Sequence, residues 1–230
     1  VALGGTASRC FVQPWGVDTA LFTADRRDDD WRRSVSAAEG PVFLANRHLH
    51  ELFRHDVLVR ATAALARETG RFSVVLVGGG SAEAALRALA GDAAPGRVHF
   101  TGRVPPDEMP RCYASADVYV DCFPSQGGGH GASLSLFEAM ACGLPVIVAN
   151  RPGLEDLVGD AGFLFPPNDS KALAEIMRRF IEDPSLGSAM GRRAVERART
   201  TADRDQNLRR FEARMEGLIA ARRATGCPAP

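Results

Sequence analysis

The chain has 230 residues, of which 45% are apolar and 24% are charged, and its 28 basic and 28 acidic residues give a formal net charge of zero. This balance creates no overall field that would favour nucleic acid or an anionic membrane surface, and apolar runs such as LPVIVA fall far short of the roughly 20 residues of a membrane span. The composition is that of a globular protein with one large or two small cores.

The first 40 residues are polar and irregular, and we expect them to form a linker that leads into the first strand. Within them, the segment DRRDDDWRR at 25–33 concentrates charge. A run of charges is usually solvated, so we expect a solvated loop there. The chain begins at Val1 without the basic head and apolar core of a signal peptide, and we expect it to be a fragment or a processed chain.

From residue 41 onward, apolar segments of strand length alternate with segments of helical period. The expected strands lie at 41–45, 72–78, 97–100, 117–123, 145–149 and 162–166. The expected helices lie near 55–69, 81–90 and 107–115, and in the segment that Gly143 and Pro145 stop. Near-continuous apolar strands that alternate with helices predict an α/β fold, with a doubly wound, Rossmann-like parallel sheet covered by helices on both faces.

After Asp169 the pattern changes to helices alone, near 170–182, 185–200 and 203–223. We therefore expect three parts, namely a linker and first strand region at 1–40, a domain at 41–200 and a carboxyl-terminal helix and tail at 201–230. The last helix is arginine-rich, and we expect it to be amphipathic. It either packs on its own domain or reaches to a second one. Because Glu212 and Glu216 separate its arginines, we expect any membrane contact to be peripheral.

The five cysteines are odd in number and widely spaced, with no CxxC motif and no Cys/His ligand spacing. This usage argues for a reducing compartment and against a zinc site. We therefore expect a cytoplasmic protein that holds no metal.

The segment PSQGGGHGASLSLFEAMACGLP at 124–145 places three glycines and a histidine before an apolar helix. The first free N–H groups of that helix, near Ala132, Ser133 and Leu134, would form an anion site together with the helix dipole, although a flexible turn is the alternative. One carboxylate, Glu138, interrupts the apolar residues. An isolated buried carboxylate is costly, so Glu138 lies either on a narrow solvent-facing stripe or against a hydrogen-bonding partner.

Ligands of a doubly wound sheet bind beyond the carboxyl ends of its strands, so the loops there are candidate sites. Arg47 directly follows the first strand, and its guanidinium could bind two phosphate oxygens. Arg54 lies seven residues further on, and either arginine could instead pair with Glu51 or Asp56.

Two further loops follow the next strands. GGGSAE at 78–83 lacks the full GxGxxG spacing and the acidic ribose partner of a dinucleotide site, and we interpret it as a tight strand-to-helix turn. TGRVPPDEM at 101–109 follows a strand and offers enough backbone donors to recognise the edge of a base.

Taken together, these segments resemble a known family. The motifs are GVDTALF, FLANR, VVLVGGG, VHFTGRVPPDEMPRCYASADVYVDCFPS, SLFEAMACGLPVIVA, GLEDLV and PPNDSKALAE, in order from about residue 8 to 200. They resemble the carboxyl-terminal, donor-binding half of retaining GT-B fold glycosyltransferases, glycosyl transferases group 1 or family 4, and the stretch 110–150 is the most specific. The resemblance implies an amino-terminal acceptor domain that this chain lacks.

The resemblance also implies roles for individual residues. Glu138 occupies the position of the second of two family glutamates, which accepts hydrogen bonds from the ribose hydroxyls of the nucleotide. A carboxylate suits that role because it is acceptor-only and can take both hydroxyls of a vicinal diol. Arg47 would neutralise the leaving diphosphate, the helix start at 132–134 would hold the distal phosphate, and the backbone around Arg103 and Val104 would hold the base.

Two positions depart from the family pattern. The first family glutamate, which touches the donor sugar, falls at His130, in the loop whose Gly129 and Gly131 let a phosphate approach the backbone closely. His130 either hydrogen-bonds a sugar hydroxyl or is a noncatalytic loop residue. The family's phosphate-binding lysine falls at Leu52, for which Arg54 is the expected substitute.

The mechanism implied by the resemblance is cofactor-free, metal-independent transfer from a nucleotide-sugar donor with retention at the anomeric carbon, driven mainly by electrostatic stabilisation of the departing diphosphate. We expect this domain to be inactive when isolated. A catalytically silent nucleoside diphosphate-binding module, a nucleotide-sugar epimerase and a dinucleotide-dependent dehydrogenase are the alternatives, and the incomplete glycine fingerprint disfavours the last. The sequence does not identify the sugar, the base or the acceptor.

Overall fold

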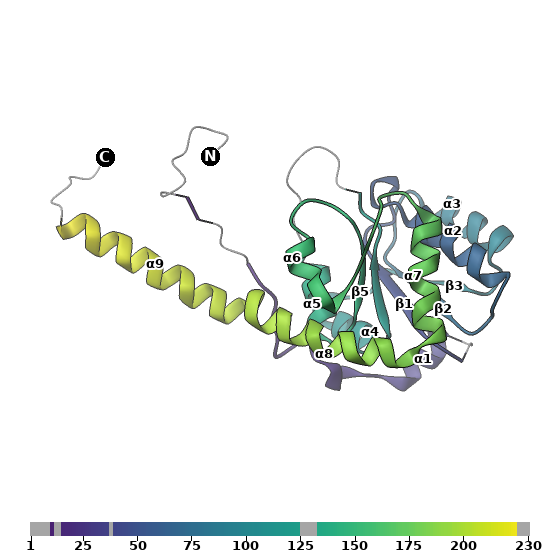
Figure 1. Ribbon diagram of the computed structural model, residues 1–230, viewed down its shortest axis with the longest axis horizontal. Coiled ribbons are helices and arrows are strands. Elements are labelled where there is room, and N and C mark those ends of the chain that lie inside the picture. Colours follow the sequence, from purple (N-terminus) through teal and green to yellow (C-terminus); the bar gives the residue numbers. More distant parts are fainter. Residues whose placement is uncertain (1–9, 12–14, 37–38, 125–132, 225–230) are drawn as a thin grey trace.

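The computed structural model describes residues 10–11, 15–36, 39–124 and 133–224, and its centre is a six-stranded sheet (Figure 1). The strands are β1 (Val42–Asn46), β2 (Ser73–Val77), β3 (Val98–Gly102), β4 (Val118–Asp121), β5 (Val146–Ala149) and β6 (Gly162–Phe165). They lie in the order β3-β2-β1-β4-β5-β6, and every neighbouring pair is parallel. This order is that of a doubly wound, Rossmann-like sheet, so the predicted fold class is confirmed.

Helices cover both faces of the sheet. Successive residues of a strand point to opposite faces, so each strand contributes side chains to two cores. In β1, Phe43 and Ala45 belong to one core and Val42 and Leu44 to the other. The first core is covered by α2 (His55–Ala66), α3 (Glu83–Ala93) and α7 (Ser170–Glu182). The second is covered by α1 (Asp29–Val35), α4 (Met109–Ala114), α5 (Leu134–Ala141) and α8 (Pro184–Thr201). Shorter elements are η2 (Ala24–Arg26), η3 (Glu51–Phe53), η4 (Pro106–Glu108), α6 (Glu155–Val158) and η5 (Gly159–Ala161).

The charged segment near residue 30 is a helix, α1, and the prediction of a solvated loop there is wrong. The carboxylate of Asp28 accepts hydrogen bonds from the backbone N–H groups of Asp30 and Trp31, which caps the helix. Trp31 and Val35 lie one turn apart and are buried in the second core. The amphipathic spacing of these two side chains therefore decides the structure, and the charges occupy the remaining positions.

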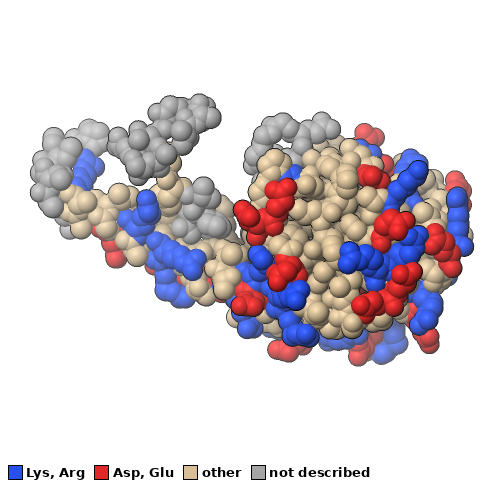
Figure 2. Space-filling model, viewed as in Figure 1, with Lys and Arg blue, Asp and Glu red and all other residues tan. Residues whose placement is uncertain are grey.

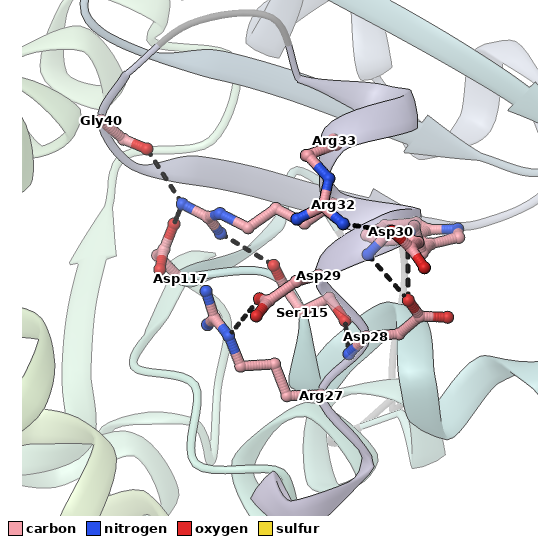
Figure 3. Close-up of polar contacts among 10 residues, drawn as sticks. Arg27, Asp28, Asp29, Asp30, Arg32, Arg33, Gly40, Ser115 and Asp117 are labelled. Atoms are coloured by element: carbon pink, nitrogen blue, oxygen red, sulfur yellow. Dashed lines mark hydrogen bonds and ion pairs between the residues drawn. The ribbon is translucent and has the colours of Figure 1, made fainter.

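Polar contacts fasten α1 to the turn between α4 and β4 (Figure 3). The guanidinium of Arg32 donates to the backbone oxygen of Ser115 at 2.8 Å and to that of Gly40 at 3.0 Å. It also pairs with the carboxylate of Asp117 at 2.7 Å. The backbone N–H of Asp28 donates to the hydroxyl of Ser115 at 2.8 Å. Residues 28–35 are thus fixed against the sheet by both apolar and polar contacts.

The last helix, α9 (Arg204–Ala224), projects away from the sheet, and basic side chains are prominent along it (Figures 1 and 2). Its apolar side chains Leu208, Phe211, Leu218 and Ile219 are exposed. They recur at i, i+3, i+10 and i+11, which places them on one side of the helix, but Arg204 and Arg222 lie on that side too, so charged and apolar side chains are not cleanly separated as predicted. On the viewed face of the domain, acidic and basic groups are interspersed, in keeping with the zero net charge (Figure 2).

The start of α9 is held by the segment that precedes η2. The backbone N–H of Val17 donates to the oxygen of Ala202 at 2.7 Å, and the N–H of Arg204 donates to the oxygen of Val17 at 2.9 Å. Further out, the guanidinium carbon of Arg214 lies 4.3 Å from the centre of the Phe11 ring. Two distant parts of the sequence therefore lie side by side at this end of the molecule.

Candidate functional site

A surface hollow of about 340 Å³ lies at the carboxyl ends of β1, β2 and β3. Its walls include Arg47 after β1, Gly79 after β2, and Arg103 and Val104 after β3. Three of the predicted site residues therefore meet in one hollow, at the edge of the sheet where ligands of this fold bind. Two larger hollows of about 610 Å³ each lie elsewhere, one beside α1 and one between α2 and α3. We favour the smaller one because of its place in the fold.

Close packing between the loops after β1 and β2 shapes this hollow. Gly78 has a φ of +137°, and a Cβ atom there would lie 2.5 Å from the backbone oxygen of Arg47. A Cβ atom at Gly80 would lie 2.3 Å from the backbone oxygen of Leu49. Only glycine allows the two loops to approach so closely. The interpretation of this glycine run as a tight strand-to-helix turn is confirmed, since β2 ends at Val77 and α3 begins at Glu83.

The Arg47 guanidinium lies between two aromatic rings and a carboxylate. Its central carbon is 5.2 Å from the centre of the Phe53 ring and 5.8 Å from that of Phe123. One of its terminal nitrogens lies 3.5 Å from Oδ2 of Asp121. Pairing with Glu51 or Asp56, which the sequence left open, does not occur at Arg47. The rings and the carboxylate fix the guanidinium at the end of β1 and leave part of it exposed.

Asp121 and Arg151 form a fully buried ion pair beside Arg47, and the sequence analysis missed both. Nη2 of Arg151 lies 3.0 Å from Oδ2 of Asp121, and each side chain is 1% exposed. Nη1 of Arg151 donates to the backbone oxygen of Phe123 at 2.9 Å. Asp121 is the last residue of β4 and Arg151 lies two residues after β5, so the rule that selected Arg47 could have found them. Two guanidinium groups share one carboxylate oxygen here, which leaves an excess of positive charge close to the hollow.

Glu138 is half-buried in α5 and is hydrogen-bonded. Its Oε2 accepts from the hydroxyl of Tyr113 at 2.8 Å. Burial raises the pKa of Glu138, and the hydrogen bond from Tyr113 lowers it in part. The hydroxyl of Tyr113 in turn accepts from the side-chain amide of Asn46 at 2.6 Å. Because Asn46 also lines the hollow, the carboxylate on α5 is linked to that hollow by two hydrogen bonds.

The remaining predicted residues have varied surroundings. Ser133 caps α5, since its hydroxyl accepts from the N–H of Leu136 at 3.2 Å, while Leu134 is exposed. Arg54 points elsewhere and pairs with Asp56 at 2.9 Å and with Asn168, as one alternative from the sequence allowed. It lines the hollow between α2 and α3 and not the one that contains Arg47. Four predicted residues lie outside the described part of the chain, namely Gly129, His130, Gly131 and Ala132.

Within the described ranges, no cluster of three or more histidine, cysteine, aspartate or glutamate side chains is arranged to hold a metal ion. A separate search of the same residues finds no helix with the length and apolarity needed to cross a membrane. The polar groups that the site presents are arginine, carboxylate and hydroxyl groups. These groups suit a phosphorylated ligand with hydroxyl donors.

The model of the family described as glycosyl transferases group 1 matches residues 40–183. The chain belongs to this family. The matched region of this glycosyltransferase chain contains the whole sheet, the hollow after β1–β3 and the Tyr113–Glu138 pair.

Two similar proteins are longer than this chain. It is 30% identical over 197 residues to a GDP-mannose-dependent monoacylated alpha-(1-6)-phosphatidylinositol monomannoside mannosyltransferase of Corynebacterium glutamicum, with 83% of this chain and 51% of the relative covered. A D-inositol 3-phosphate glycosyltransferase of Acidothermus cellulolyticus is 34% identical over 207 residues, with 85% and 45% covered. The chain thus spans about half the length of these relatives.

A solved structure supports the fold independently. The sucrose-phosphate synthase of Thermosynechococcus elongatus matches with a TM-score of 0.76 and 27% identity, over 92% of this chain and 53% of the other. As with the sequence relatives, the match covers about half of the larger protein.

Proposed function

We propose that this chain is the donor-binding half of a retaining glycosyltransferase that takes a sugar from a nucleoside diphosphate. The observation that carries the proposal is the geometry around Glu138. A half-buried carboxylate on α5, with one oxygen fixed by Tyr113, is joined through Asn46 to the hollow that Arg47, Arg103 and Val104 line. A carboxylate in that place can accept both hydroxyls of a ribose, and the guanidinium of Arg47 in the hollow suits the diphosphate.

The proposed roles follow the arrangement of the groups. Glu138 accepts hydrogen bonds from the ribose diol, and the backbone around Arg103 and Val104 contacts the base. Arg47 binds the diphosphate and stabilises the negative charge that grows on it as the bond to the sugar breaks. Arg151 adds a second positive charge close by, although its guanidinium is engaged with Asp121. The start of α5 faces the distal phosphate, where its free N–H groups favour an anion.

The proposal also covers the rest of the enzyme. We infer that transfer proceeds without a metal ion, that an amino-terminal domain supplies the acceptor site, and that the isolated chain is inactive for that reason. The names of the relatives point to mannose or another hexose as the sugar and to a lipid-linked or phosphorylated inositol as the acceptor. A cytoplasmic location is part of the proposal, because Cys112, Cys122 and Cys142 are buried free thiols.

A catalytically silent nucleoside diphosphate-binding module is the second candidate, and one observation favours it. Leu52 stands where the family has a phosphate-binding lysine, and it is exposed. Arg54, the expected substitute, is held by Asp56 and Asn168 and is absent from the hollow that contains Arg47. The diphosphate would therefore have fewer positive partners, which weakens catalysis more than binding of the nucleoside.

The test is release of nucleoside diphosphate from GDP-mannose and from UDP-glucose by the chain joined to its amino-terminal domain. We expect Arg47→Ala and Glu138→Ala each to lower the turnover of the accepted donor by about 100-fold or more. Arg178→Ala is the matched control, because Arg178 pairs with Glu68 on a distant surface. Unchanged turnover in both site variants would refute the proposal. Binding without any turnover in the unaltered protein would instead establish the silent module.

A further inference from the structure

Three side chains from three different elements form a chain of hydrogen bonds behind the candidate site. Asn46 at the end of β1 donates to the hydroxyl of Tyr113 on α4 at 2.6 Å. The same hydroxyl donates to Oε2 of Glu138 on α5 at 2.8 Å. The contact from Asn46 to Tyr113 joins residues 67 positions apart, and the one from Tyr113 to Glu138 joins residues 25 positions apart.

The number of available protons fixes which group donates in each of these two hydrogen bonds. A tyrosine hydroxyl has one proton to donate, and an ionised carboxylate can only accept. The proton of Tyr113 is therefore given to Glu138, and Asn46 must present its NH₂ group and not its oxygen to Tyr113. The oxygen Oδ1 of Asn46 is consequently turned away from Tyr113. It is buried and has no hydrogen-bond partner among the residues that the structure describes.

Packing holds Tyr113, the middle residue of the hydrogen-bonded row, in one position. The side chain of Tyr113 is fully buried. Its ring centre lies 5.9 Å from that of Phe22 and 6.0 Å from that of Tyr119, both in edge-to-face geometry. A ring held in this way can place its hydroxyl at only one point. The carboxylate that accepts from that hydroxyl is then oriented by the protein core and not by solvent.

We propose that Tyr113 and Asn46 are positioning residues, which hold Oε2 of Glu138 so that the rest of the carboxylate faces the two hydroxyls of a ribose. The inference rests on the proposed function, since it needs a nucleotide in the site. Asn46 is suited to the role because it lines the hollow and contacts Tyr113 at once.

The test measures the preference for a ribose diol, which a general loss of structure does not change. Affinities of the chain for GDP and UDP are compared with those for their 2′,3′-dideoxy analogues, and the ratio reports the contact between Glu138 and the diol. We expect the preferred nucleotide to bind more tightly than its dideoxy analogue. Tyr113→Phe keeps the buried ring and removes the hydroxyl, and we expect it to lower that ratio by about tenfold.

A second variant tests the direction of the hydrogen bonds. Asn46→Asp keeps the shape of the side chain but has no proton to donate, so it competes with Glu138 for the proton of Tyr113. We expect it to lower the same ratio. Tyr119→Phe is the matched control, because Tyr119 is equally buried, touches Tyr113, and its hydroxyl has no partner within the described residues. We expect the control to leave the ratio unchanged.

The outcomes separate the two proposals. If the unaltered chain prefers the diol and Tyr113→Phe and Asn46→Asp keep that preference, the positioning role is wrong and the proposed function stands. If the unaltered chain binds neither nucleotide, both proposals fail.

The pH dependence gives an independent readout. The ionisable groups that face Glu138 are Tyr113 on α4, Tyr119 on β4, and Cys142 directly after α5. Because the hydrogen bond from Tyr113 lowers the pKa of Glu138, its removal raises that pKa. The preference for the diol should therefore disappear at a higher pH in Tyr113→Phe than in the unaltered chain. An identical pH profile would contradict the positioning role.

Discussion

Two of the regions that contain arginine–aspartate pairs, one around α1 and one at the carboxyl end of β4, differ in how deeply the pairs are buried. In the first region, Arg27 and Asp29 lie 2.9 Å apart with side chains 47% and 63% exposed. In the second, Arg151 and Asp121 lie 3.0 Å apart with side chains 1% exposed. The two distances differ by only 0.1 Å, so the large difference between the pairs is their burial.

The difference teaches what each pair contributes. An exposed pair is screened by water and salt and adds little to stability, so α1 depends on the burial of Trp31 and Val35. A buried pair costs much to desolvate, and removal of one partner leaves the other charge uncompensated. Asp121 therefore has two roles: it neutralises Arg151 in the core, and it holds Arg47 at the site.

The largest expected effect comes from breaking the buried pair. Asp121→Ala leaves the buried Arg151 guanidinium without its carboxylate and should lower the free energy of unfolding by about 3–5 kcal/mol. Denaturant unfolding followed by circular dichroism measures this change. Asp29→Ala, which removes the exposed carboxylate, is the matched control. A loss below about 1 kcal/mol for Asp121→Ala would show that burial does not distinguish the two regions.

The next effect comes from removing the apolar anchor of α1. Trp31→Ala deletes a buried indole from the second core, and we expect a loss of about 3 kcal/mol in the free energy of unfolding. Trp15→Ala is the control, because Trp15 is 89% exposed. Equal stabilities of the two variants in the same denaturant experiment would mean that α1 is held by its charges after all.

A third effect appears only in acid and concerns a histidine near the buried pair. Burial lowers the pKa of His55 from 6.5 to about 4, so the unfolded chain binds a proton that the folded chain does not. Its contribution is fully present above pH 6.5 and is lost as the pH falls toward 4, where the loss approaches about 3 kcal/mol. The free energy of unfolding, measured between pH 7 and pH 4, should therefore depend less on pH in His55→Leu than in the unaltered chain. It should keep its normal pH dependence in His48→Leu, which changes an exposed histidine. Parallel curves for His55→Leu and the unaltered chain would contradict this.

The smallest effect is expected at the surface of α1. Arg27→Ala breaks the exposed pair with Asp29, and the free energy of unfolding should change by no more than about 0.5 kcal/mol. The change should shrink further in 1 M salt, because screening weakens an exposed pair. A larger loss of unfolding free energy that does not change with salt would show that this exposed pair stabilises the protein as strongly as the buried pair of Asp121 and Arg151.

The strands and most helices could be predicted because their apolar pattern is local. VFLAN and SVVLV are buried along their whole length or nearly so, which is typical of parallel strands between two helical layers. Helix α1 was missed because its charges outnumber its apolar residues. The signal was nevertheless present, as Asp28 is a good cap and Trp31 and Val35 lie four positions apart.

The candidate site was predictable in part. Arg47 and Val104 follow strands, and the resemblance to a family identified Glu138. Asp121 follows the same rule, but it stands inside an apolar run and was included in the strand. The contacts of Asn46 and Tyr113 could not be predicted, because they join elements that only the three-dimensional fold brings together.

The central claim is that the hollow lined by Arg47, Arg103 and Val104, together with Glu138, binds a nucleoside diphosphate. Calorimetric titration of this chain with GDP, UDP and ADP, in parallel with Glu138→Ala, tests it most directly. We predict micromolar binding of one of these nucleotides and at least a tenfold loss of affinity in the variant. Absence of binding by all three, or equal affinity in the unaltered chain and in Glu138→Ala, would contradict the account.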